Sequence, residues 1–370
     1  MPNSRLVCAS FIFHTAYAYT HTLTRGRIPS SLGLLSNISV VLLFQNHLTG
    51  PLPEAMNRSN VPLLSAFSAE DNQLTGTIPP MFGSTKLFYL WLSGNNVEGP
   101  IPEEMGEMTN LQYLYLDNNQ LTGTIPSSFA KLTELRYLAV DRNYNPHSER
   151  TLYGSLDLFE NITHLTYFTA SQNSFSGSIP HTLSGLKYLK TLDLSENAFI
   201  GSIPQTYFGQ MVSLGSLFLQ SNQFVGPVPI PRSINLTVFD VSMNTFTGTV
   251  PTELFALPSI SILSLSANCL EIKLSTSICQ STTIEELFMS GLGRNNGCPS
   301  SNPFVTPPVV PSCLWTMRSL KKLYISGVDD NIMVTIAYYM FLSCFTHLIP
   351  TSASTIFLRA QLYNRRISLY

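Results

Sequence analysis

The stretch 111–126 (LQYLYLDNNQLTGTIP) is the clearest copy of a motif that recurs along most of this chain. It has the form L-x-x-L-x-L-x-x-N-x-L-x-G-x-I-P, and a period of roughly 20–29 residues is the signature of a solenoid of stacked units. This repeat constrains the fold more than any other feature. Asparagines in the same frame recur at intervals of 22 to 30 residues, at Asn46, Asn72, Asn95, Asn119, Asn143, Asn173, Asn197, Asn222, Asn244 and Asn268.

The spacing inside each unit predicts a short strand followed by a turn. Leu114 and Leu116 alternate as on a strand with one buried face, and the chain turns at Asn119. A unit this small cannot bury its apolar face alone, so it must stack on copies of itself. Stacking encloses the Asn side chain, which must then bond to backbone groups of the turn. Gly123 permits an unusual backbone angle and Pro126 fixes φ on the return path. We expect a curved solenoid with a parallel sheet on its concave side.

The residues LxxLxLxxNxLxGxIP resemble the plant-type leucine-rich repeat. That family includes receptor-kinase ectodomains, receptor-like proteins and polygalacturonase inhibitors. The resemblance covers residues 23–328, with good matches from 38 to 268 and degenerate ones after. It implies an α/β solenoid, a right-handed superhelix shaped as a horseshoe arc, with extracellular recognition as its role and no catalysis within the repeats.

Composition and motifs exclude several classes of function. A net charge of −2 with 11% charged residues argues against nucleic-acid binding, and a hydrophobic content of 44% argues against disorder. The seven histidines occupy unrelated repeat positions. The segment 291–297 (GLGRNNG) departs from a phosphate-binding loop, and kinase and G-x-S-x-G signatures are missing. We predict no enzyme activity, no cofactor and no metal site.

The two ends of the chain do not fit the repeat. Residues 1–22 carry Arg5, an apolar run and a small-residue triplet, as in a signal peptide; the alternative is an incomplete gene start. The tail 329–370 contains the segment 332–349, which lacks Lys, Arg, Asp and Glu over 18 residues, about the minimum for a transmembrane helix. Arginines after this segment predict a cytoplasmic C-terminus, whereas a frayed last repeat or out-of-frame sequence is the alternative. The expected location is the cell surface, with a single membrane span, or secretion.

Four of the six cysteines cluster where the repeat decays. A disulfide between Cys279 and Cys298 would fix the degenerate unit near Ile284, and Cys313 could pair with Cys269 or Cys298. The sequence does not decide this connectivity, and buried free thiols are the alternative. The lack of a C-x-x-C motif or a nearby histidine argues against zinc.

Two surface features are expected on the solenoid. The repeat at Asn143 carries an insertion, 144–153 (YNPHSERTLY), which is either a rim loop that contacts a ligand or, as we favour, a tolerated insertion. N-glycosylation sequons are compatible with secretion, although chance would produce about as many in so Asn- and Ser/Thr-rich a chain. They lie at Asn37, Asn57, Asn161 and Asn235.

The best functional signal is a column of aromatic residues on four consecutive repeats. The positions six and four before each repeated Asn face the concave surface, on strands about 4.8 Å apart. Asp117, Asp141 and Arg142 flank the column toward the turn. We predict a platform that binds a peptide or glycan; the alternative is cross-strand pairing for stability alone. The aromatic residues are Tyr89, Trp91, Tyr113, Tyr115, Tyr137 and Tyr167.

These features predict a non-catalytic, receptor-like recognition module that binds a peptide, protein or glycan on its concave face. The chain shows no signalling domain of its own, so a receptor role would require a signalling co-receptor. Two other classes remain open. One is a secreted inhibitor of a wall-degrading enzyme, and the other is a structural cell-wall or matrix protein.

Overall fold

In this computed structural model the chain divides into two compact units, Met1–Ala337 and Tyr338–Tyr370. The described residues are 16–19, 24–80, 82, 86–146, 150–157, 159–271, 275–292, 298, 311–326 and 333–337, all in the first unit. Most of the candidate signal segment 1–22 and most of the candidate membrane segment 332–349 lie outside the described residues.

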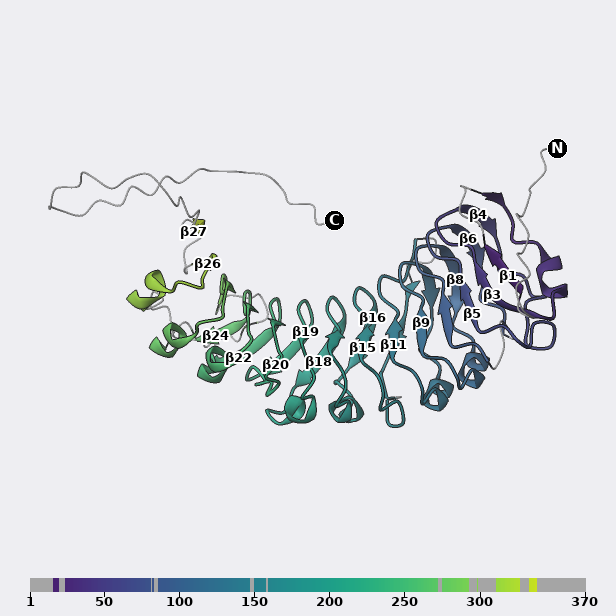
Figure 1. The fold of residues 1–370 in the computed structure, drawn as a ribbon. Coiled ribbons are helices and arrows are strands. Elements are labelled where there is room, and N and C mark those ends of the chain that lie inside the picture. Colours follow the sequence, from purple (N-terminus) through teal and green to yellow (C-terminus); the bar gives the residue numbers. More distant parts are fainter. Residues whose placement is uncertain are drawn as a thin grey trace. The chain divides into compact units, whose positions relative to one another are not determined.

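The first unit is an arc of stacked repeats around one sheet of fourteen short strands (Figure 1). Neighbouring strands are parallel and their register follows the repeat, so that Tyr113 pairs with Tyr89 on one side and Tyr137 on the other. Only the last pair is antiparallel within this sheet. The strands, in spatial order, are β1 (Ala16–Tyr19), β3 (Ile38–Leu42), β5 (Ala66–Ser68), β7 (Tyr89–Trp91), β9 (Tyr113–Tyr115), β11 (Tyr137–Ala139), β15 (Tyr167–Thr169), β17 (Thr191–Asp193), β19 (Ser216–Phe218), β21 (Val238–Asp240), β23 (Ile262–Ser264), β25 (Glu286–Phe288), β26 (Lys322–Ser326) and β27 (Met333–Ala337).

A second series of parallel strands follows the turn of each repeat and is divided in two by the insertion. The insertion forms its own antiparallel hairpin of β12 (Tyr144–Asn145) and β13 (Arg150–Thr151). The first group is β10 (Gln120–Thr122), β8 (Asn96–Pro100), β6 (Gln73–Gly76), β4 (His47–Gly50) and β2 (Arg25–Gly26). The second is β14 (Tyr153–Gly154), β16 (Ser174–Gly177), β18 (Ala198–Ser202), β20 (Gln223–Gly226), β22 (Thr245–Thr249) and β24 (Cys269–Glu271).

Short 3-10 helices form the convex edge of the arc, along the bottom of Figure 1. The proline of the Gly-x-Ile-Pro run is usually the residue before the helix; Pro126, for example, has a φ of −59°, which its ring imposes. The helices are η1 (Ser30–Leu34), η2 (Glu103–Glu107), η3 (Ser127–Lys131), η4 (His181–Gly185), η5 (Tyr207–Gln210), η6 (Thr252–Ala256), η7 (Thr276–Gln280) and η8 (Ser312–Thr316).

The core lies between the sheet and the 3-10 helices and runs the length of the solenoid. Leu114, Leu116 and Leu121 of the reference repeat have exposed fractions of 0%, and each such side chain contributes roughly 1.5–3 kcal/mol on burial. In the later repeats the position of Leu121 is taken by phenylalanines such as Phe199 and Phe224, whose rings stack 6.1 Å apart. The apolar spacing of the motif therefore defines one continuous core, as predicted.

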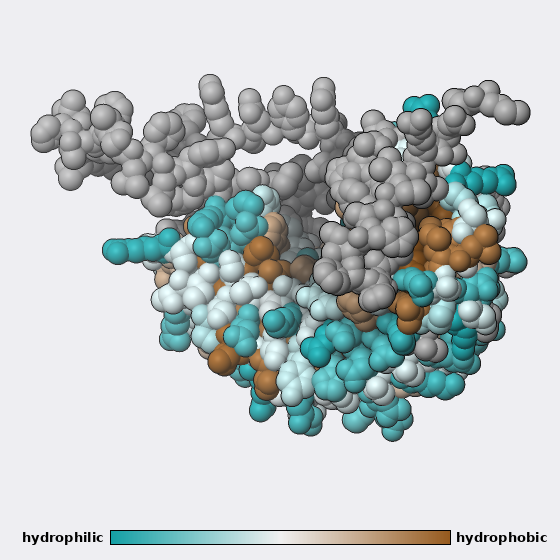
Figure 2. Space-filling model, turned by 45° about the vertical axis from the view of Figure 1, so that its right-hand side comes forward, coloured by the Kyte–Doolittle hydropathy of each residue, from teal (hydrophilic) through white to brown (hydrophobic). Residues whose placement is uncertain are grey.

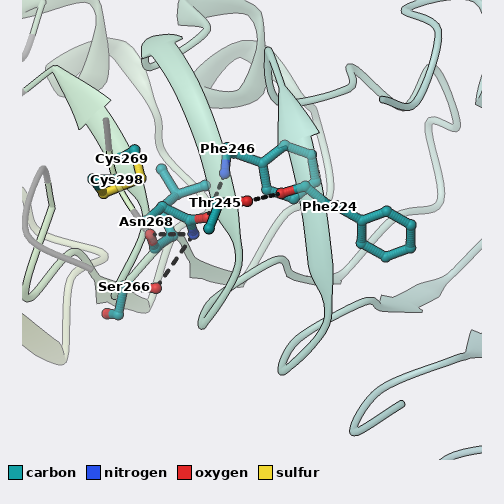
Figure 3. Close-up of a disulfide and its surroundings, with 8 residues drawn as sticks. Phe224, Thr245, Phe246, Ser266, Asn268, Cys269 and Cys298 are labelled. Atoms are coloured by element: carbon teal, nitrogen blue, oxygen red, sulfur yellow. Dashed lines mark hydrogen bonds between the residues drawn. A yellow bond between two sulfur atoms is a disulfide. The ribbon is translucent and has the colours of Figure 1, made fainter. Parts of the chain in front are cut away.

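The repeated asparagines form a ladder that connects adjacent repeats. Asn268 accepts a hydrogen bond at Oδ1 from the backbone N–H of Phe246 in the preceding repeat, at 3.1 Å. Its Nδ2 donates to the carbonyls of Val241, Leu265 and Ser266 (Figure 3). The same pattern recurs at Asn119. The prediction that these side chains satisfy turn backbone groups is confirmed by the structure.

The residue before each ladder asparagine adopts a left-handed backbone conformation, which the sequence analysis did not foresee. Examples are Gln45 with φ 52°, Asp71 with φ 54° and Met243 with φ 53°. This conformation disfavours residues with a Cβ by roughly 1–2 kcal/mol. The ladder hydrogen bonds that follow it in every repeat offset this cost.

The predicted pairing of Cys279 with Cys298 is wrong. Cys269 is bonded to Cys298 (Figure 3), and Cys279 is bonded to Cys313. Cys269 follows the last ladder asparagine on β24, whereas Cys279 lies on η7, next to η8 in the stack. The second disulfide therefore joins two neighbouring 3-10 helices, because Cys313 lies on η8.

The candidate membrane segment 332–349 differs from the expected helix where it is described. Its residues Met333–Ala337 form β27, antiparallel to β26. Within the described residues, no helix has the length and apolar character needed to cross a membrane.

Candidate functional site

Strands β7, β9, β11 and β15 carry the aromatic side chains predicted on the concave face. On β9, Leu114 is fully buried between Tyr113 and Tyr115, which are half-buried. Strand β7 repeats this pattern with Tyr89 and Trp91. Because alternate residues of a strand point to opposite faces, the buried leucines fix the rings on the face that looks away from the core.

These rings form one continuous surface, here called the aromatic face and comprising all six predicted residues. Tyr113 and Tyr137 stack with ring centroids 5.1 Å apart, and Tyr137 and Tyr167 stack at 5.5 Å. Trp91 lies 4.9 Å from Tyr115. Separations of roughly 4.5–7 Å allow aromatic attraction of about 0.5–1.5 kcal/mol per pair. The remaining contacts are Tyr89–Trp91 at 6.0 Å, Tyr89–Tyr113 at 5.9 Å, Tyr89–Tyr115 at 6.1 Å and Tyr115–Tyr137 at 6.2 Å.

A hollow of about 410 Å³ lies on this face, where the strands pass into their turns. Its size falls in the range of roughly 300–1,000 Å³ found for ligand pockets. The lining combines aromatic rings with four carboxylates and contains no basic residue. It consists of Glu70, Asp71, Trp91, Ser93, Gly94, Tyr115, Asp117, Asn118, Tyr137, Ala139, Asp141 and Tyr167.

Hydroxyl groups hold the carboxylates of the hollow in place. The Ser93 hydroxyl donates to Asp117 at 2.5 Å. The hydroxyl of Thr169 donates to Asp141, which also accepts from the backbone N–H of Ser171 at 2.7 Å and from its hydroxyl at 3.0 Å. Each bond joins one repeat to the next, so the carboxylates are positioned by the stacking of the solenoid.

Burial shapes the electrostatics of the hollow. It raises the pKa of Asp117 and of Asp141 above the ordinary value. Repulsion from Asp141 raises the pKa of Asp117 further. Burial likewise raises the pKa of Glu70, although the hydrogen bond from Ser68 acts to lower it. Burial also raises the pKa of Tyr115 to about 12. These shifts describe a partly dehydrated site with excess negative charge.

The structure brings most of the predicted site residues together. Trp91, Tyr115, Asp117, Tyr137, Asp141 and Tyr167 line the hollow. Tyr89 and Tyr113 belong to the aromatic face beside it. Arg142 does not line the hollow, although its guanidinium acts to lower the pKa of Asp117, by less than burial raises it.

Three lining residues of the hollow, Glu70, Asp71 and Ala139, were not predicted as site residues from the sequence. Glu70 lies two residues before Asn72, which is the same repeat position as Asp117 and Asp141, so extending that column by two repeats would have found it. Ala139 occupies the position that Tyr115 holds one repeat earlier. Its small side chain leaves open the space that a larger residue would fill.

Outside the hollow, the other predicted sites are on the surface. Asn37, Asn161 and Asn235 are exposed, whereas Asn57 is half-buried and donates to the carbonyl of Glu54. In the insertion, His147 and Glu149 lie outside the described residues. Within the described residues, no three or more His, Cys, Asp or Glu side chains are grouped to hold a metal ion.

Comparison with known proteins agrees with the architecture. The family model described as "Leucine rich repeat" matches residues 163–224, and a second of the same description matches residues 86–108 and 110–132. Receptor-like protein 18 of Arabidopsis thaliana is 32% identical over 230 residues, which are 62% of this chain and 21% of that protein. These matches show that the chain contains leucine-rich repeats, and that its repeats are similar to those of a plant receptor-like protein. The chain spans about a fifth of the length of this leucine-rich-repeat relative.

Two solved leucine-rich-repeat structures show the same fold. One is the plant peptide hormone receptor RGFR1 in complex with RGF2, with a TM-score of 0.63 and 26% identity over 83% of this chain and 53% of that chain. The other is the Arabidopsis receptor kinase HAESA in complex with the peptide hormone IDA and the co-receptor SERK1. Its TM-score is 0.61, with 31% identity over 74% of this chain and 48% of that chain.

Proposed function

We propose that this leucine-rich-repeat chain is an extracellular or cell-surface, receptor-like recognition module that binds a peptide on its concave aromatic face. The observation that carries the proposal is the grouping of six aromatic side chains on four adjacent strands, four of which line one hollow. Aromatic side chains supply large contact area at low entropic cost and dominate binding surfaces.

The relatives support a peptide rather than another ligand. RGFR1 and HAESA were each solved with a peptide hormone, and HAESA also with a co-receptor. By analogy, a co-receptor would couple binding on this chain to signalling. The surface in view in Figure 2 is mainly teal and white, with brown residues in separate groups.

The test is peptide capture by the full chain from a random phage-displayed dodecapeptide library. Wild-type protein is expected to enrich peptides whose binding falls at least about tenfold in the variant Tyr113→Ala/Tyr115→Ala/Tyr137→Ala. The matched control is Phe288→Ala/Tyr324→Ala, which removes an aromatic pair stacked 4.7 Å apart on the same sheet but away from the hollow. Peptides that bind all three proteins equally, or no enrichment by the wild type, would overturn the proposal.

A further inference from the structure

Resting on the proposed function, we infer that the hollow takes an arginine side chain of the peptide ligand, held between aromatic rings and carboxylates. The proposal assigns a chemical class to the contact that anchors the peptide. Three independent features of the lining point to it: the rings, the sign of the charge and the geometry of the acceptors.

The rings provide a surface suited to a cation. Trp91, Tyr115 and Tyr137 line the hollow, and a guanidinium over such rings is attracted by the negative potential of their faces. The indole Nε1 of Trp91 is buried and has no hydrogen-bond partner among the described residues. The Trp91 ring, rather than its N–H group, is therefore what a ligand meets.

The charges of the lining are compensated only in part, by Arg142 outside the hollow. Glu70, Asp71, Asp117 and Asp141 all contribute to the hollow, and no basic residue lines it. Repulsion between Asp117 and Asp141 is one reason why the pKa of Asp117 is raised. A bound cation would relieve this repulsion, whereas a carboxylate or phosphate ligand would add to it.

The acceptors favour a planar, branched cation over a metal or a lysine. An ionised carboxylate offers about four acceptor positions, of which the Ser93 and Asn118 side chains occupy two at Asp117. Within the described chain the acids are not grouped as metal ligands. A guanidinium stacks on rings and donates several hydrogen bonds in a fixed fork, so it can contact ring and carboxylates together.

Trp91 itself is the reporter for the test. The chain has two tryptophans, so in a Trp315→Phe background all tryptophan fluorescence comes from Trp91 in the hollow. The probes are the synthetic peptides Ac-Gly-Ser-Xaa-Ser-Gly-NH2 with Xaa as arginine, lysine or citrulline. Citrulline has nearly the same shape as arginine but no charge. We expect a saturable change in Trp91 emission, with the arginine peptide at least about tenfold tighter than the citrulline peptide.

Variants of single carboxylates distinguish binding in the hollow from non-specific attraction to an acidic protein. Asp71→Asn and Asp117→Asn are each expected to weaken the arginine peptide by about threefold or more. Asp71 is exposed, and its backbone is in the left-handed conformation with φ 54°. Asparagine adopts this conformation readily, so Asp71→Asn should fold. Asp240→Asn is the control, because this half-buried carboxylate of the same sheet accepts a hydrogen bond from Ser242 and does not line the hollow.

Two results would overturn the inference. One is equal affinity for the arginine and citrulline peptides; the other is unchanged Trp91 emission with all three peptides. Failure of the arginine inference can be distinguished from failure of the proposed function. If library peptides still bind in a tyrosine-dependent way but carry no arginine, recognition on the aromatic face stands and the arginine contact alone is rejected. If no library peptide depends on the tyrosines, both are rejected.

Discussion

At the residue scale, the ladder asparagine is the link between sequence and fold. Asn222 Oδ1 accepts a hydrogen bond from the backbone N–H of Phe199, and its Nδ2 donates hydrogen bonds to three carbonyls from two repeats. No other short side chain combines donor and acceptor in this way. Asn173 is a natural exception: its Oδ1 is buried without a partner within the described residues, because the preceding repeat is displaced by the insertion. Its Nδ2 still bonds to three carbonyls.

This difference predicts unequal effects of removing the two side chains. Asn222→Ala leaves a buried N–H and carbonyls unpaired, and each such group costs about 1–3 kcal/mol. Asn173→Ala leaves only carbonyls unpaired and removes an unsatisfied oxygen, so it should destabilise the chain less. Urea unfolding followed by circular dichroism measures both variants. If both variants lose the same unfolding free energy, or Asn173→Ala loses more, the hydrogen bond accepted by Asn222 Oδ1 contributes nothing to stability.

At the scale of the elements, close packing of the 3-10 helices limits which residues they carry. Gly106 of η2 lies against η3, where an added Cβ would meet Ser128 Cβ and the Ser128 carbonyl oxygen, both at 2.4 Å. Gly185 of η4 has nothing within 4 Å of the same added atom. The convex edge is therefore tight in some repeats and open in others.

We predict that Gly106→Ala destabilises the chain by about 1–3 kcal/mol, as overpacking does. Gly185→Ala should be neutral or stabilising by about 0.4–1 kcal/mol, because alanine restricts the unfolded chain. Thermal unfolding of the two single variants compares them directly. A Gly106→Ala protein as stable as Gly185→Ala would mean that η2 and η3 are not packed as described.

The elements also show what the sequence could predict. Leu114 and Asn119 recur with fixed spacing, so strand, turn and ladder followed from the repeat alone, and the alternating positions located the aromatic face. The disulfide partners did not follow, because Cys269 and Cys279 lie in repeats that have lost the motif. The left-handed residues were missed because Gln45, Met243 and their equivalents share a backbone conformation but no common side chain.

At the scale of the whole molecule, half-buried carboxylates are spread along the inner face of the solenoid. Burial raises the pKa of Asp193 and Asp240 as it does in the hollow, in spite of hydrogen bonds from Ser195 and Ser242. The folded chain therefore binds protons at these groups more tightly than the unfolded chain does. Such a difference couples folding stability to pH.

We predict that the chain unfolds at a higher temperature at pH 5 than at pH 7.5. A raised folded pKa means that stability falls as the pH rises from the unfolded value of about 3.9 through the folded value. Glu107, whose pKa is lowered by Arg58, loses its stabilising contribution only below its ordinary pKa, so this contribution does not change between pH 5 and pH 7.5. Asp240→Asn should reduce the difference between the two pH values. A melting temperature that rises with pH, unaffected by this variant, would contradict the prediction.

If a ligand docks on the aromatic face of β7 to β15, its binding should be sensed by Trp91. The test compares Trp91 emission, in the Trp315→Phe chain, with the calorimetric titration of a library-selected peptide. We expect a saturable change in emission whose midpoint matches the calorimetric affinity. Calorimetric binding with no change at Trp91 would mean that the ligand docks elsewhere on the chain.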